Sequence, residues 1–140
     1  MGNTRKTVYN NICSSEKLAQ ANPENLQLGK DFLEYLTSVD RAKTTVKSYG
    51  HDLKIIWVLC LELLNNKFFV DLSKRDIVKI QNYCLNTLGW SPARMRRVKS
   101  TISSLSNYIE NMLDDEFEGY RPIVRKIENP PSCTVREKTV

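Results

Sequence analysis

The amino-acid sequence predicts an all-α fold. Apolar residues recur at intervals of three and four in four separate segments, and each segment is bordered by helix start and stop signals. The one short apolar run that could form a strand, residues 68–72, has no second run with which to pair, so it is expected to be an extended connection that fills the core. With 140 residues, 41% apolar and 26% charged, the chain has ordinary globular composition and enough length for one core.

The last of the four predicted helices carries the strongest signals and runs from Pro92 to Met112. Ser91 is a suitable N-cap and Pro92 suits the first helical position. The apolar stripe that follows predicts one buried face and consists of Met95, Val98, Ile102, Leu105, Ile109 and Met112.

The first two predicted helices both lie in the N-terminal half of the chain. One spans Asn25 to Ser38, and the next starts at Thr44 or Thr45 as its cap and continues to Leu64. The second half of that helix is apolar nearly all round, which favours a place in the centre of the fold for Ile55, Val58 and Leu59.

The third helix is expected from Ser73 to about Leu88. Ser73 and Asp76 have the spacing of a capping box, and Gly89 supplies a stop.

Outside the helices the sequence predicts flexible termini. Residues 1–25 are polar and read as a mobile arm, with at most a short turn at Ser14 to Ala21, and Arg5 and Lys6 could touch a polyanion. The folded domain should cover 26–128, with a short fifth helix allowed from Pro122. Residues 129–140 read as a linker.

The placement of charge indicates an anionic partner. The net charge is +5, and between Gly89 and Ile109 there are four cations and no acid. Basic and hydroxyl side chains lie opposite the apolar stripes of the second and fourth helices. The candidate DNA-binding residues are Lys43, Thr44, Thr45, Lys47, Ser48, His51, Lys54, Ser91, Arg94, Arg96, Arg97, Lys99, Ser100 and Ser103.

Within this set the lysines suit phosphate, together with the exposed amides at the helix start. Arg96 is expected to project farthest from the buried stripe, which makes it the candidate for reading guanine in the major groove.

Other site classes find little support in the sequence. The four cysteines form no CxxC pair and there is one histidine, so neither a metal nor another cofactor is expected. His51 has no sequence partner for catalysis. The longest apolar run is about half the length that a membrane span needs, and no signal segment is present, so we expect a cytoplasmic protein.

Two patterns carry a resemblance to a known family. They are Thr45-x-x-x-Tyr49-x-x-Asp52-Leu53 and Arg97-x-x-Ser100-x-Ile102-x-x-Leu105-x-x-Tyr108-Ile109. In this order they resemble the N-terminal core-binding domain of tyrosine recombinases, the phage-integrase family, over Leu26 to Pro130. The resemblance implies a four-helix, SAM-like orthogonal bundle whose second and fourth helices lie at the major groove of a recombination core site.

The departures from the family are informative. Family members place a tyrosine nucleophile, arginines, a lysine and a His-x-x-Arg element in a separate C-terminal domain, whereas the one histidine here is followed by Asp52-Leu53-Lys54. The resemblance therefore implies that this chain is not itself an enzyme. Its implied partners are double-stranded DNA, the catalytic domain of the same parent protein and other recombinase protomers. Both a fragment and a natural truncation fit this reading.

An alternative is a helical protein-interaction module with a solvated basic face, in which a partner covers Ile55, Val58 and Leu59. An independent enzyme lacks any convincing set of residues. The first two readings differ in whether Lys47 and Arg96 lie on the same side of the fold. The acidic run from Asp114 to Glu118 should point away from a duplex or contact a basic partner.

Overall fold

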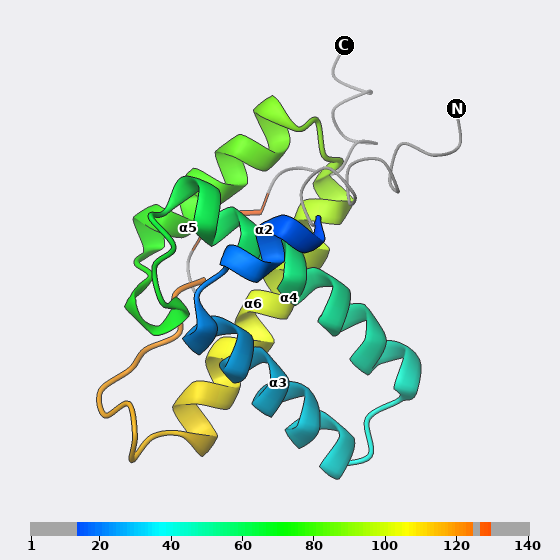
Figure 1. The fold of residues 1–140 in the computed structure, drawn as a ribbon, viewed down its shortest axis with the longest axis vertical. Helices are drawn as coiled ribbons and strands as arrows, with labels where there is room; N and C mark the ends of the chain where they lie inside the picture. The colour runs from blue at the N-terminus through cyan, green and yellow to red at the C-terminus, as the bar shows by residue number, and fades with distance from the viewer. Residues whose placement is uncertain (1–13, 125–126, 130–140) are drawn as a thin grey trace. The chain divides into compact units, whose positions relative to one another are not determined.

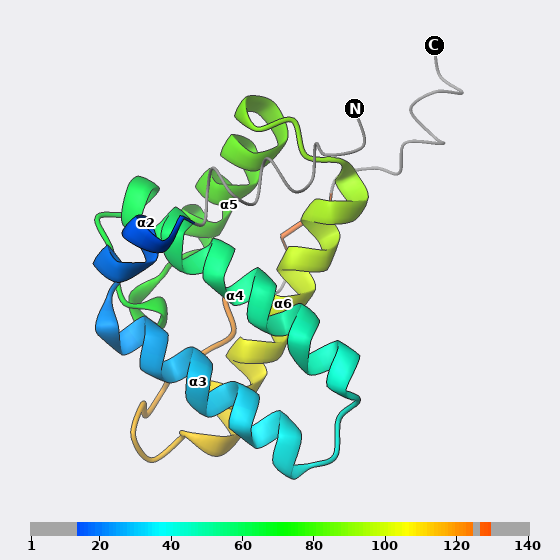
Figure 2. The ribbon, with the colours of Figure 1, turned by 45° about the vertical axis from the view of Figure 1, so that its right-hand side comes forward.

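The computed structural model describes residues 14–124 and 127–129, and it confirms the all-α class (Figures 1 and 2). These residues contain no strand. Their elements are α2 (Ser15–Gln20), α3 (Pro23–Ser38), α4 (Lys43–Leu63), the 3-10 turn η1 (Phe69–Asp71), α5 (Lys74–Asn82), the π-helical turn η2 (Tyr83–Thr87) and α6 (Pro92–Met112). The chain divides into two compact units between Leu72 and Ser73, so α4 and α6 belong to different units.

In the first unit, α3 and α4 lie side by side (Figures 1 and 2). Gly29 allows this close approach, because a Cβ atom there would lie 3.1 Å from Nε1 of Trp57. The Phe32 and Tyr49 rings pack at 5.8 Å between centroids, and Trp57 meets Phe69 edge-on at 6.0 Å. Aromatic rings from three elements therefore fill the core of this unit.

A buried asparagine fixes the chain after α4. Asn25 is 0% exposed, donates from Nδ2 to the Lys67 carbonyl at 3.0 Å and accepts from the Phe69 amide at 2.7 Å. Phe69 is also 0% exposed. The prediction that residues 68–72 fill the core is confirmed, but the connection contains a 3-10 turn where we expected an extended strand-like segment.

A second pair of hydrogen bonds joins the asparagines Asn22 and Asn66. The Oδ1 atom of Asn66 accepts from the Asn22 amide at 2.8 Å, and Nδ2 of Asn22 donates to the Asn66 carbonyl at 3.0 Å. Asn66 has a φ of 57°, a left-handed conformation that asparagine tolerates better than most residues. These contacts join the start of α3 to the end of α4.

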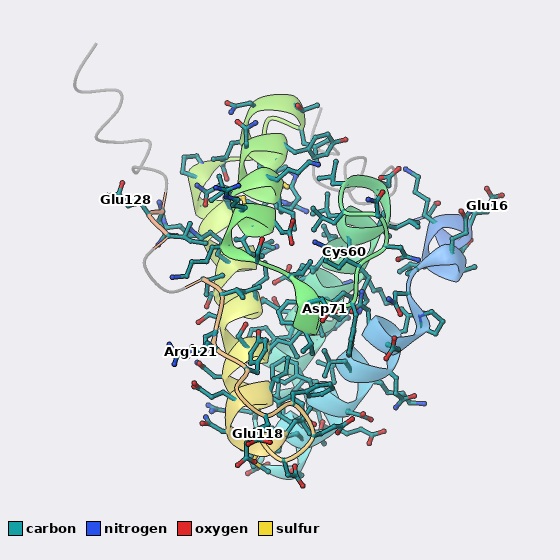
Figure 3. The ribbon with its side chains drawn as sticks, turned by 90° about the vertical axis from the view of Figure 1, so that its left-hand side faces the viewer. Glu16, Cys60, Asp71, Glu118, Arg121 and Glu128 are labelled. Carbon is teal, nitrogen blue, oxygen red and sulfur yellow. The ribbon has the colours of Figure 1, made fainter. Side chains whose placement is uncertain are left out.

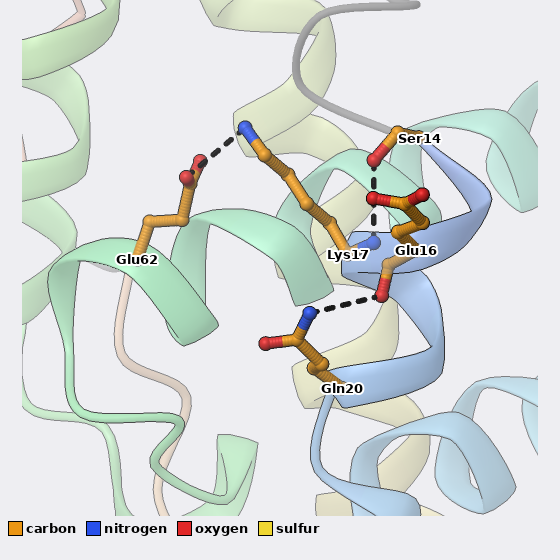
Figure 4. Close-up of polar contacts among 5 residues, drawn as sticks. All are labelled: Ser14, Glu16, Lys17, Gln20 and Glu62. Carbon is orange, nitrogen blue, oxygen red and sulfur yellow. Dashed lines mark hydrogen bonds and ion pairs between the residues drawn. The ribbon is translucent and has the colours of Figure 1, made fainter.

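Ser15–Gln20 form helix α2, in the region where we expected a mobile arm with at most a short turn at Ser14 to Ala21. Ser14 caps α2 by accepting from the Lys17 amide at 3.2 Å, and Nζ of Lys17 pairs with Oε2 of Glu62 on α4 at 3.0 Å (Figure 4). Ala21 is 3% exposed. With Asn22 as its cap, α3 begins two residues before the predicted start. The expected roles of Arg5, Lys6 and residues 130–140 lie outside the described residues.

The predicted cap of α4 was wrong. Ala42 is the N-cap, so Thr44 and Thr45 lie within the first turn. The expected burial of the second half of α4 is confirmed, because Ile55, Val58 and Leu59 are 2%, 0% and 1% exposed.

In the second unit, the capping box at the start of α5 is confirmed. Oγ of Ser73 accepts from the Asp76 amide at 3.2 Å, and Oδ2 of Asp76 accepts from the Ser73 amide at 2.9 Å. The helix does not run uniformly to Leu88, because η2 widens its last turn. Gly89, with a φ of 72°, then reverses the chain.

The bounds of α6 match the prediction, and Ser91 caps it by accepting from the Arg94 amide at 3.1 Å. The stripe residues from Met95 to Ile109 are each 0% exposed, but Met112 is 48% exposed and does not belong to the core.

No helix forms in the described part of the predicted segment that starts at Pro122. Residues 120–124 and 127–129 instead run irregularly back along α6 (Figure 3). Ile123 is buried and is 7% exposed. The short fifth helix of this fold is therefore α2, at the other end of the chain.

Candidate nucleic-acid interface

A line of basic side chains follows one face of α4. Lys43, Lys47, His51 and Lys54 are separated by four, four and three residues, which places them on one side of a helix, and all are exposed. Thr44 and Thr45 are exposed beside them and Ser48 is half-buried. We call Lys43, Lys47, His51 and Lys54 the α4 basic face.

The exposed charged residues within the segment 41–54 are all basic. From Arg41 to Lys54 the sequence contains a single carboxylate, Asp52, and that residue is 1% exposed. Arg41 is exposed like the lysines. A solvated helix face more often mixes acids with lysines, so this segment presents an unusually uniform positive surface.

The start of α4 adds backbone donors to the same end of the helix. The N-cap residue, Ala42, has no side-chain acceptor, and no side chain caps the helix. The amide groups of the first helical turn have no partner within a helix, and they carry its partial positive charge. An anion beside Lys43 would therefore meet both an ammonium group and helix amides.

On α6 the exposed side differs from the one that we predicted. Arg97, Ser100, Asn107 and Asn111 are exposed, whereas Arg96 and Ser103 are half-buried. Exposed Ala93 and half-buried Ser104 lie on the same line of the helix as Arg97 and Ser100, and neither was predicted as a site residue. Arg97, and not Arg96, is thus the arginine on the outermost line of this helix. We call Ala93, Arg97, Ser100, Ser104, Asn107 and Asn111 the α6 ridge.

Lys99 was predicted to be a DNA-binding residue on one shoulder of this helix, but the structure buries it. It is 5% exposed, and its Nζ atom donates to the carbonyls of Ile127 and Glu128 at 3.3 and 3.1 Å. Burial lowers the pKa of Lys99. The returning C-terminal segment covers the flank that holds Lys99, so the exposed centre of α6 shifts toward Arg97.

Two further predicted residues have structural roles at the start of α6. Ser91 is exposed but serves as the helix cap, and the Arg94 guanidinium lies 4.5 Å from the ring centroid of Trp90, within cation–π range. Burial raises the pKa of the nearby Cys84 thiol to about 12, partly offset by the charge of Arg94. Cys84 therefore stays a neutral, unreactive thiol in the core.

The predicted residues thus form two surfaces, one on each unit. The α4 basic face and the α6 ridge are described separately because they belong to different units. The expectation that Lys47 and Arg96 lie on the same side stays a prediction. Within the described chain, no group of three or more His, Cys, Asp or Glu side chains is placed to hold a metal ion. No helix of residues 14–124 is long and apolar enough to cross a membrane.

Comparison with known proteins gives one informative relative. The chain is 30% identical over 122 residues to the SPbeta prophage-derived recombinase-like protein YomM of Bacillus subtilis (strain 168). The aligned region covers 85% of this chain but 35% of that protein. This chain is similar to part of a recombinase-like protein. No protein-family model and no solved structure matches the chain.

Proposed function

We propose that this chain is a DNA-binding module of the core-binding type found in tyrosine recombinases, and that it holds recombination-site DNA for a catalytic domain of the same parent protein. The observation that carries the proposal is the α4 basic face, where exposed charge is uniformly positive from Arg41 to Lys54. The similarity to part of a prophage recombinase-like protein supports the link to recombination.

In this proposal the two surfaces divide the work. Lysine ammonium groups and first-turn amides suit phosphate oxygens, so the α4 basic face supplies affinity for any duplex. The α6 ridge combines one arginine with small side chains at Ser100 and Ser104. Small side chains allow a helix axis to approach the groove, and an arginine can donate to O6 and N7 of guanine together.

The alternative, a protein-interaction module, loses the surface on which it depended. Ile55, Val58 and Leu59 are buried, so they are not available for a partner to cover. Among the described residues, the exposed large apolar side chains lie on three helices and one loop, and they are Leu26, Val39, Val78 and Met112.

The proposal is tested by electrophoretic titration of the chain against duplex DNA from the attachment site of its prophage and against an unrelated duplex of equal length. Each titration is repeated at several salt concentrations. We expect binding to both duplexes at low salt, tighter binding to the attachment site and a steep loss of affinity as salt rises. Absence of binding to either duplex at low salt would contradict the proposal.

The α6 ridge gives a prediction about sequence reading. Arg97→Ala should weaken binding to the attachment site by about 1 to 3 kcal/mol and binding to unrelated DNA by much less, because a lost base contact matters only where that base is present. Arg96→Ala, the matched variant one residue away, should lose less because its side chain is half-buried. Equal losses on both duplexes for Arg97→Ala would show that Arg97 contacts only the backbone. A larger loss for Arg96→Ala would restore the original assignment.

A further prediction concerns chemistry. Because the residues that family members use for strand cleavage lie in their C-terminal domain, this chain alone should form no covalent bond with DNA. Incubation with a nicked suicide substrate that carries the attachment site, followed by denaturing electrophoresis, should show no slower-migrating protein–DNA adduct. An adduct would overturn the placement of catalysis outside this chain.

A further inference from the structure

The segment after α6 is held along the helix by contacts at two levels. The hydroxyl of Tyr120 donates to Oγ of Ser106 at 3.1 Å, and Nζ of Lys99 donates to the carbonyls of Ile127 and Glu128. Lys99 and Ser106 are seven residues apart, so they lie on the same face of α6 about two turns from each other. The later part of the segment meets the earlier part of the helix, so the two run antiparallel, as Figure 3 shows between Glu118 and Glu128. We call residues 120–124 and 127–129 the strap.

The strap is packed as well as hydrogen-bonded. Ile123 is 7% exposed, Pro122 is buried, and Ser106 is 0% exposed beneath it. The Glu128 carbonyl also accepts from Nε2 of Gln81 on α5 at 3.4 Å. The last described residues before Pro130 are therefore fixed to both helices of the second unit.

Holding the strap with a buried lysine lowers stability more than apolar packing would, which suggests that the position of the strap is what Lys99 provides. Burying an ammonium group opposes folding, and two carbonyls without a formal negative charge compensate it less well than a carboxylate would. A methionine of similar length could fill the same space without that cost. The charged hydrogen bonds of Lys99 instead fix two successive carbonyls in one place, which apolar packing does not do.

We infer that Lys99 is a positioning residue that makes the strap and α6 move as one body, so that Ile127 and Glu128 keep a fixed place along the helix. This inference does not depend on DNA binding.

Hydrogen–deuterium exchange of the whole chain, without DNA, tests the inference. In Lys99→Met, amide exchange in peptides covering 120–129 should accelerate on the order of tenfold, while peptides covering 98–109 of α6 keep their protection. Lys79→Met, which removes an exposed lysine on α5, should change neither region. Unchanged exchange in 120–129 with α6 still protected would overturn the inference.

If Lys99→Met removes protection throughout α6, the variant Tyr120→Phe replaces it in the test. This variant removes one hydroxyl and leaves the buried lysine in place. Faster exchange in 120–129 of this variant supports a strap held by specific hydrogen bonds. Exchange equal to that of the native chain overturns it.

Discussion

Leu105→Ala is expected to lower the free energy of unfolding by about 2 to 5 kcal/mol. Leu105 is 0% exposed in the middle of α6, between stripe neighbours Ile102 and Ile109 that are also 0% exposed. Truncation removes apolar contacts and leaves a cavity that a close-packed helix face cannot readily fill. Urea unfolding followed by circular dichroism measures the loss.

The matched control for this variant is Asn107→Ala, which changes an exposed residue of the same helix. Its unfolding midpoint should stay close to the native value. A Leu105→Ala midpoint equal to that of Asn107→Ala would show that the stripe of α6 is not part of the core.

Asn25→Ala should lower the free energy of unfolding by about 2 to 4 kcal/mol, because it leaves a buried backbone amide and a partly buried carbonyl without their partners. The Phe69 amide would lose its acceptor at 2.7 Å, and the Lys67 carbonyl would lose its donor at 3.0 Å. Phe69 packs edge-on against Trp57, so loosening this turn should also disturb the aromatic core of the first unit. Thermal unfolding followed by near-ultraviolet circular dichroism reports both effects.

The control for Asn25→Ala is Gln27→Ala, two residues further along α3, where the exposed side chain donates to Oδ1 of Asp31 at 2.8 Å. This change should have little effect on the melting temperature. Equal melting temperatures for the two variants would mean that the amide contacts of Asn25 add nothing to stability.

Local signals in the sequence predicted much of the fold. The bounds of α6 and the capping box of α5 follow from residues within a few positions of each helix end, such as Ser91 and Ser73. By contrast, α2 is a six-residue helix with no buried residue of its own, and its Lys17 pairs with Glu62 on α4 at 3.0 Å. A contact across 45 residues of sequence leaves no local pattern.

In the candidate site, too, local spacing was predictable and distant contacts were not. The α4 basic face follows directly from helical spacing, and the structure leaves its four side chains exposed. The assignment on α6 was less accurate because a segment 28 residues away covers Lys99. Helical periodicity places Lys99 on a shoulder, and only the tertiary contact with Ile127 decides whether that shoulder is exposed or buried.

The most direct test of the central claim compares salt dependence in two variants of equal charge. One replaces Lys43, Lys47 and Lys54 with alanine, and the other replaces the exposed lysines outside this face, Lys30, Lys74 and Lys79. Fluorescence anisotropy with a labelled duplex gives the slope of log affinity against log salt. If each α4 lysine neutralises one phosphate, the first variant should have a slope smaller by roughly 2.7 units, while the second keeps nearly the native slope. Equal slopes for the two variants would contradict a phosphate-binding role for the α4 basic face.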